Sequence, residues 1–236
     1  MILKSPEPGR KQANFHIFDI VNIMQKIFYS LITAIAALCA VSCNVISGNP
    51  ADKAESYAKA IELTRKNVDG ERFKIYSVSF IEMGELSNDL GLVTVKMVNK
   101  DDRAFSQSYY LSGAEPTDLR EVQSVFEAPE YETTVGIDLG KLSPETIAAQ
   151  IAEAKSMLPE GHTFKSVGRY EIEEEVPAGM SHFNRNKEPG KQTTSFTVRF
   201  TEDGKETESS AGKTSIIYYE GKATVNSDGS LSIEDN

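Results

Sequence analysis

Two segments of the chain carry apolar residues at the spacing of an amphipathic helix. The first runs from about Asp52, a residue type that caps helix N-termini, to Val68. The second runs from about Ser143, another capping residue type, to Leu158, with Pro144 at the first helical position. The two predicted caps, Asp52 and Ser143, are 91 positions apart.

After each predicted helix, apolar and polar residues alternate with the period of two that is typical of β-strands. The alternating positions of the first half are Tyr76, Val78, Phe80; Val93, Val95, Met97; and Phe105, Tyr109, Leu111. Those of the second half are Phe164, Tyr170, Ile172; Phe196, Val198, Phe200; and Ile216, Tyr218. A fourth strand is predicted in each half, at Val135, Ile137, Leu139 and at Leu231, Ile233. Short loops between successive strands favour antiparallel pairing, and Asp203-Gly204 and Asp228-Gly229 are hairpin signals.

The two halves also match in sequence. The matched segments, in the same order in both halves, are 69–74 with 160–165, 81–82 with 172–173, 94–97 with 197–200, and 109–110 with 218–219. We therefore predict an α+β fold of two tandem repeats, 52–142 and 143–236, each a helix followed by a three- to four-stranded antiparallel sheet. The halves differ by insertions. Leu119, Val122 and Phe126 suggest a short helix in the first, while 176–192 and 206–213 are predicted loops.

The segment before the first helix has a different character. Lys26 precedes an almost unbroken apolar run, Ile27–Ala40, and small residues then lead to Cys43. This is the three-part layout of a secretory signal. The run is shorter than the roughly 20 residues that a membrane-spanning helix needs.

The residues Ala40-Val41-Ser42-Cys43 resemble the lipobox of bacterial lipoproteins. In that family the signal is cut just before the cysteine, whose sulfur receives a diacylglyceryl group. The resemblance implies a signal peptide at 24–42 and lipidation of Cys43, although Ala40 stands where leucine is usual. The alternatives are cleaved export without lipidation, an uncleaved membrane anchor, and a buried apolar helix with a chance cysteine.

Residues 1–23 fit badly in front of such a signal, because they contain Pro6, Pro8 and Asp19. We therefore predict that translation begins at Met24. Residues 43–51 are without periodicity and read as a tether. No charged export tag follows Cys43, which favours a lipid anchor on the periplasmic face of the outer membrane over the cell surface.

A helix followed by three or four antiparallel strands, in tandem, resembles the α+β units of the PepSY and β-lactamase inhibitor protein group. Those families are mostly non-catalytic and bind proteins or peptides across their sheets. The resemblance therefore implies an envelope protein or peptide partner, as an analogy of topology that assigns no residues.

Charge and motifs restrict the chemistry. The net charge of −10 disfavours nucleic acid, because phosphate contacts need clustered Lys and Arg. Neither a phosphate-binding glycine loop nor a Gly-x-Ser-x-Gly motif occurs. The three histidines, His16, His162 and His182, share no metal-ligand spacing, and we predict neither a cofactor nor a catalytic residue.

One acidic cluster has two interpretations. Strand alternation would place Glu171, Glu173 and Glu175 on one face, where three carboxylates could bind a hard cation such as calcium. No ordered Asp, Asn and Gly loop accompanies them, so a solvated strand end is the preferred interpretation and no metal site is predicted.

The tyrosine pairs Tyr109-Tyr110 and Tyr218-Tyr219 supply the candidate contact residues. Neighbours on a strand point to opposite faces, so one ring of each pair can pack in the core while the other is exposed. Tyr110 and Tyr219 are therefore candidate contacts to a ligand or partner, together with His182 and Phe183 of the inserted loop. The alternative is a sheet edge covered by aromatic side chains.

Together these patterns favour a membrane-anchored lipoprotein of the cell envelope that acts as a non-catalytic binding or interaction module. The alternative function is an envelope hydrolase or glycan-processing enzyme, which would require a cleft lined by convergent carboxylates.

Overall fold

The computed structural model describes residues 48–122, 129–175, 188–210 and 212–235. The predicted signal peptide, Cys43, His182 and Phe183 lie outside these residues. No helix within the described ranges is long and apolar enough to cross a membrane.

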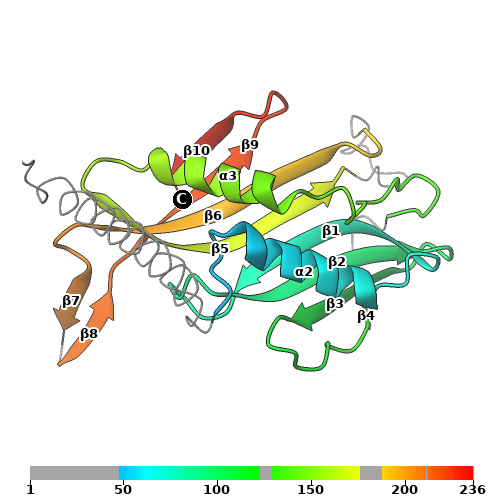
Figure 1. The fold of residues 1–236 in the computed structure, drawn as a ribbon, viewed down its shortest axis with the longest axis horizontal. Coiled ribbons are helices and arrows are strands. Elements are labelled where there is room, and N and C mark those ends of the chain that lie inside the picture. Colours follow the sequence, from blue (N-terminus) through cyan, green and yellow to red (C-terminus); the bar gives the residue numbers. More distant parts are fainter. Residues whose placement is uncertain (1–47, 123–128, 176–187, 211, 236) are drawn as a thin grey trace, which may run out of the picture. The chain divides into compact units, whose positions relative to one another are not determined.

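The described residues form an α+β fold, as predicted, around one eight-stranded antiparallel sheet (Figure 1). Its strands are β1 (Phe73–Glu82), β2 (Leu90–Asn99), β3 (Ala104–Tyr110), β4 (Arg120–Glu121), β5 (His162–Glu174), β6 (Gln192–Glu202), β9 (Tyr219–Val225) and β10 (Leu231–Asp235). Their order is β10-β9-β6-β5-β1-β2-β3-β4. The first strands of the two halves, β1 and β5, pair antiparallel with Ser79 opposite Glu171 and Phe80 opposite Tyr170. The halves therefore share a single continuous sheet.

Both helices lie on the same face of this sheet and pack against each other (Figure 1). Helix α2 spans Ala54–Asn67 and α3 spans Pro144–Ser156. The predicted cap of the second helix is confirmed, because Ser143 Oγ accepts a hydrogen bond from the backbone N–H of Thr146 at 3.1 Å.

The predicted cap of the first helix is wrong. Helix α2 begins after Lys53, which makes no side-chain capping bond. Asp52 instead binds across the molecule: its carboxylate accepts hydrogen bonds from Lys155 Nζ at 2.9 Å and from Asn88 Nδ2 at 3.0 Å. Because the Asp52 carboxylate binds Lys155 of α3, it does not cap α2.

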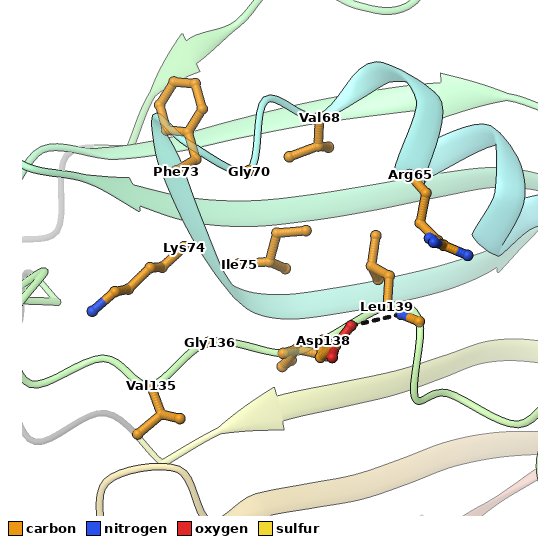
Figure 2. Close-up of a pocket in the computed structure, with 12 residues that line it drawn as sticks. Arg65, Val68, Gly70, Phe73, Lys74, Ile75, Val135, Gly136, Asp138 and Leu139 are labelled. Carbon is orange, nitrogen blue, oxygen red and sulfur yellow. Dashed lines mark hydrogen bonds between the residues drawn. The ribbon is translucent and has the colours of Figure 1, made fainter.

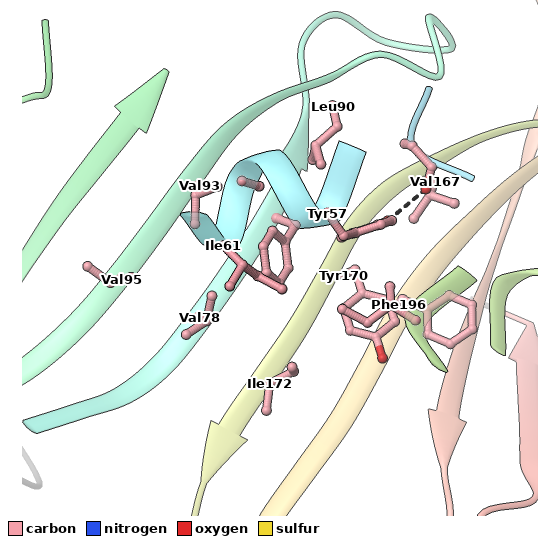
Figure 3. Packing of buried hydrophobic residues seen from close by; sticks show 14 of the residues in the cluster. Tyr57, Ile61, Val78, Leu90, Val93, Val95, Val167, Tyr170, Ile172 and Phe196 are labelled. Carbon is pink, nitrogen blue, oxygen red and sulfur yellow. Dashed lines mark hydrogen bonds between the residues drawn. The ribbon is translucent and has the colours of Figure 1, made fainter. Parts of the chain in front are cut away.

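The core lies between the helices and the sheet, and its centre is aromatic (Figure 3). The Tyr57 ring of α2 meets Phe80 edge-on at 5.2 Å and Tyr170 at 5.8 Å, while Tyr170 stacks on Phe196 at 5.3 Å. Tyr57 donates its hydroxyl proton to the carbonyl of Ala51 at 2.7 Å. Since these rings come from both halves, one core serves the whole described body.

Three segments differ from the prediction. Residues 135–139 form no strand; Ile137 donates one backbone hydrogen bond to Ile75 O at 2.7 Å within a connection that we call the strap (residues 130–142). The predicted loop 206–213 contains most of a separate two-stranded hairpin, β7 (Thr207–Ser210) and β8 (Lys213–Ile216). Of the predicted helix near Leu119, residues 120–121 form β4, and 123–128 lie outside the described ranges.

The last residues of the predicted tether belong to the folded body. Asn49 O accepts a backbone hydrogen bond from Leu90 at 2.7 Å, and Ala51 N donates one to Asn88 O at 2.8 Å. Ala51 is buried beneath Tyr57. The chain therefore enters the body at the loop between β1 and β2.

Candidate functional site

The sheet face opposite the helices is the candidate site, and we call it the open face. Side chains alternate along a strand, and residues in register on neighbouring strands share a face. Phe80 and Tyr170 point toward the helices, so their neighbours Ser79 and Glu171 point to the open face.

A row of hydroxyl residues crosses the open face over seven strands. From β10 to β3 the residues in register are Ser232, Thr224, Ser195, Glu171, Ser79, Thr94 and Ser108. All except Glu171 are serine or threonine, and we call this set the hydroxyl row. Ser79 Oγ donates to Glu171 Oε1 at 2.6 Å, and the hydroxyls of Thr94 and Ser108 lie 2.8 Å apart.

The adjacent row of the open face, nearer the start of β1, contains charged groups that are paired with each other. Lys96 Nζ lies 3.3 Å from Glu173 Oε1, and these residues flank Ser77 in the register. Ser77 is 1% exposed, and its hydroxyl has no hydrogen-bond partner among the described residues. Burial, reinforced by the charge of Glu173, raises the pKa of Tyr76 to about 12.

The row on the other side of the hydroxyl row has a mixed character. Its residues in register are Glu234, Lys222, Thr197, Arg169, Ile81, Leu92 and Tyr110. Charged residues lie toward β10, and the partly exposed apolar and aromatic residues lie on β1, β2 and β3. The open face thus has a polar centre and an aromatic corner at Tyr110.

A hollow of about 500 Å³ lies on the open face where β1 ends, and Glu82, Arg199 and Glu220 are among the residues that line it. The Glu82 side chain is 2% exposed, and its Oε2 lies 2.7 Å from Nη1 of Arg199. Arg199 Nε binds Glu220 Oε1 at 2.6 Å. Gly168 leaves room for the Arg199 side chain, because a Cβ at this position would lie only 2.9 Å from the Arg199 guanidinium carbon.

The polar network continues from this hollow to the helix layer. Glu82 Oε1 accepts from the backbone N–H of Asn88 at 2.5 Å, and Asn88 Nδ2 donates to Asp52. Burial alone would raise the pKa of Asp52, but hydrogen bonds from Lys155 and Asn88 outweigh it and hold that pKa below its usual range. These carboxylates are fixed by partners, which suits a structural role better than proton transfer.

A second hollow, of about 460 Å³, lies under the strap (Figure 2). Lys74 Nζ donates to the carbonyls of Tyr131 and Thr134, each at 2.8 Å, and Asp138 accepts from the backbone of Gly140. Glu174, 6% exposed, accepts backbone hydrogen bonds from Val135, Gly136 and Gly190 at 2.8, 2.6 and 3.0 Å. These contacts hold the strap against β1 and β5.

The structure places two of the predicted contact residues on different faces. Tyr110 lies on the open face, partly exposed, while Tyr109 is buried, as the alternation predicts. In the second pair neither ring is in the core: Tyr219 is 44% exposed and stacks on Phe200, and Tyr218 donates its hydroxyl to Glu85. His162 packs edge-on against both Phe200 and Tyr219.

The acidic cluster is divided among basic or hydroxyl partners. Glu171 binds Ser79, Glu173 binds Lys96, and Glu175 lies 3.0 Å from Lys191 Nζ. No group of three His, Cys, Asp or Glu among the described residues could hold a metal ion. The hydroxyl row was not predicted from the sequence, although small hydroxyl residues alternate with apolar ones in these strands. Its register across seven strands becomes visible only in the paired sheet.

Comparison with known proteins gives no relative: no family model, no curated protein and no solved structure matches the chain.

Proposed function

We propose that the protein is a lipoprotein of the cell envelope, anchored through Cys43 to the periplasmic face of the outer membrane, whose body binds a protein partner without catalysis. The membrane address rests on the apolar run and the lipobox-like residues that end at Cys43. The binding function rests on the hydroxyl row of the open face.

The dimensions and chemistry of the open face suit a protein surface. Seven strands spaced by about 4.8 Å, with three rows of outward residues, present on the order of 30 by 20 Å. This is close to the roughly 800 Å² that each partner gives to a standard protein interface. The partly exposed hydroxyl groups, which exclude Ser79 at 4% exposure, can exchange water for a partner's polar groups. Tyr110 offers an aromatic anchor at the edge.

The ionised groups near the open face support binding rather than chemistry. A general acid or base needs a group that is free to exchange a proton with a substrate at the working pH. Glu82 and Glu220 share Arg199, and Glu173 pairs with Lys96. These carboxylates are thus engaged by basic side chains of the protein itself.

We also propose that the body arose by duplication of one unit, a helix followed by antiparallel strands. The sequence matches between the halves support it. The order of the strands adds support, since β1 and β5 meet at the centre and the later strands of each half extend outward on either side.

The test of the binding surface is a bulky substitution in the hydroxyl row. Ser195→Arg places a long side chain beside Glu171 on the open face, while Ala152→Arg adds the same side chain to the exposed side of α3. Native envelopes carrying each variant are cross-linked, and the recovered partners are identified by mass spectrometry. A protein captured by the wild type and by Ala152→Arg, and lost with Ser195→Arg, supports the proposal. Equal capture by all three, or recovery of the monomer alone, contradicts it.

The membrane address has its own test. Cells grown with a labelled fatty acid should incorporate the label into the wild type and not into Cys43→Ser. The mature wild-type chain should also begin at residue 43. An unmodified amino terminus in a soluble extract would contradict the proposed anchor, as abundant peptides from residues 1–23 would contradict a start at Met24.

A further inference from the structure

Exposed apolar side chains gather at one end of the described body. The six large hydrophobic residues exposed within the described ranges are Met83, Leu119, Val135, Met157, Ile216 and Tyr219. Four of these lie at the end where β1 stops and β5 begins: Met83, Met157, Ile216 and Tyr219. Of the other two, Val135 lies in the strap toward the opposite end of β1, and Leu119, just before β4, lies level with the middle of β1.

Contacts of these residues and of their neighbours place all four at the same end. Tyr219 packs against His162, the first residue of β5. Met83 belongs to the β1–β2 loop and donates its backbone N–H to Asp89 O at 2.7 Å. Ile216 ends the β7–β8 hairpin two residues before Tyr218, which contacts Glu85 of that loop. Met157 directly follows the last residue of α3, and Lys155 of that helix reaches Asp52. Figure 1 shows the hairpin and the start of β5 on the same side of the view.

The chain enters the body at this end. Asn49 hydrogen-bonds to Leu90, the first residue of β2, and Ala51 hydrogen-bonds to Asn88 of the β1–β2 loop. Only residues 44–48 separate Asn49 from Cys43, and at about 3.5 Å per extended residue they reach at most about 20 Å. A lipid on Cys43 therefore keeps the β1–β2 loop within that distance of the membrane.

We infer that this end of the body, which we call the membrane-facing end (Met83, Met157, Ile216 and Tyr219), contacts the interface of the lipid bilayer. The inference rests on the proposed lipid anchor at Cys43. Because the tether is short, the membrane-facing end has a high effective concentration at the bilayer. A small apolar contact is therefore sufficient to orient the body. The net charge of −10 provides no general attraction to anionic lipid, so the contact is apolar and insensitive to salt.

The orientation has a consequence for binding. Strand β4 and the strap lie toward the other end of β1, away from the bilayer. Tyr110 and the hollow at Glu82 lie nearer the membrane-facing end, since Leu92 pairs with both Tyr110 and Ile81. A partner on the open face would thus meet the aromatic corner close to the membrane surface.

The chain contains no tryptophan, which makes a single introduced Trp a clean probe. Ile216→Trp and Val135→Trp replace residues that are 59% and 64% exposed at the two ends, so neither change disturbs the core. The mature lipidated variants are reconstituted into vesicles containing lipids brominated near the headgroup. We expect fluorescence of Ile216→Trp to fall at least about twofold on changing to brominated lipid, and that of Val135→Trp to stay constant.

The experiment distinguishes a failure of the membrane-facing end from a failure of the proposed lipid anchor at Cys43. Mass spectrometry of the same preparation establishes whether Cys43 is acylated. Acylated protein with equal quenching at both positions, or none at either, overturns the membrane-facing end and leaves the anchor intact. Protein without acylation at Cys43 overturns both. Quenching that disappears in high salt would replace the apolar contact by an electrostatic one and would contradict the inference.

Discussion

At the residue scale, the most constrained group of the open face is Glu82. It is almost fully buried, and its charge is balanced by Arg199 and by hydrogen bonds from Asn88 and Ser166. Removing one partner of a buried ion pair leaves an uncompensated charge, which costs far more than the pair itself contributes.

We predict that Arg199→Ala lowers the free energy of unfolding by about 2 to 4 kcal/mol. This loss is smaller than for a fully enclosed ion pair, because the hollow lets water reach the carboxylate. The matched control is Arg103→Ala, which breaks an exposed pair with Glu121 and should leave stability unchanged. Urea denaturation measures both. Equal losses for the two variants would show that the Glu82 network is no more important than a surface pair.

The Asp52–Lys155 pair predicts a pH dependence. The folded state holds the pKa of Asp52 below its ordinary value of 3.8, so the pair stabilises the protein above that pH and is lost as pH falls through the lower folded pKa. The melting temperature of the wild type should exceed that of Asp52→Asn above about pH 4, and the difference should close on further acidification. A difference independent of pH would indicate that Asp52 acts through packing alone.

At the element scale, the strap shows how a segment without regular structure is held in place. Its backbone N–H groups at Val135 and Gly136 have no strand partner and bind the Glu174 carboxylate instead. Gly136 adopts a φ of 97°, which a residue with a side chain rarely takes. The segment therefore depends on one buried carboxylate rather than on a ladder of hydrogen bonds.

Glu174→Gln should lower the free energy of unfolding by about 1 to 3 kcal/mol, because an amide replaces a charged acceptor of three backbone hydrogen bonds. Hydrogen exchange at Val135 and Gly136 should accelerate more than exchange in β2. Glu173→Gln, one residue away on the partly exposed side, is the control and should change neither quantity appreciably. Unchanged exchange in the strap of Glu174→Gln would contradict the role of the carboxylate.

At the scale of the whole molecule, the β1–β5 junction joins the two halves. Phe80 is 1% exposed and touches Tyr57 of the first half and Tyr170 of the second. The core residues of both halves form one cluster. Such a core predicts cooperative unfolding of the described body.

Phe80→Ala should cost about 3 to 5 kcal/mol and lower the stability of both halves together, since it removes a ring at their shared centre. Denaturation should remain a single transition, and hydrogen exchange should accelerate in β2 and β6 alike. Tyr219→Ala, which truncates an exposed ring, is the control and should have a much smaller effect. Two separate transitions would show that the halves fold independently.

The sequence predicted the elements with local patterns most reliably. Ile147, Ile151 and Ala154 recur at helical spacing and are buried in α3, and Ser143 caps that helix as expected. Asp52 failed as a cap because Lys155, distant in sequence, binds its carboxylate. The alternation at Ile137 and Leu139 correctly indicated burial, but no neighbouring strand was available to complete a ladder.

By itself the sequence determined two helices, most of the strands and the antiparallel order within each half, because periodicity and capping act between residues close in the chain. Only the tertiary structure decided that β1 pairs with β5, that both helices cover the same face and that a hydroxyl row crosses the other. These features depend on pairings between residues about 90 positions apart, such as Ser79 with Glu171, whose energies no local pattern contains.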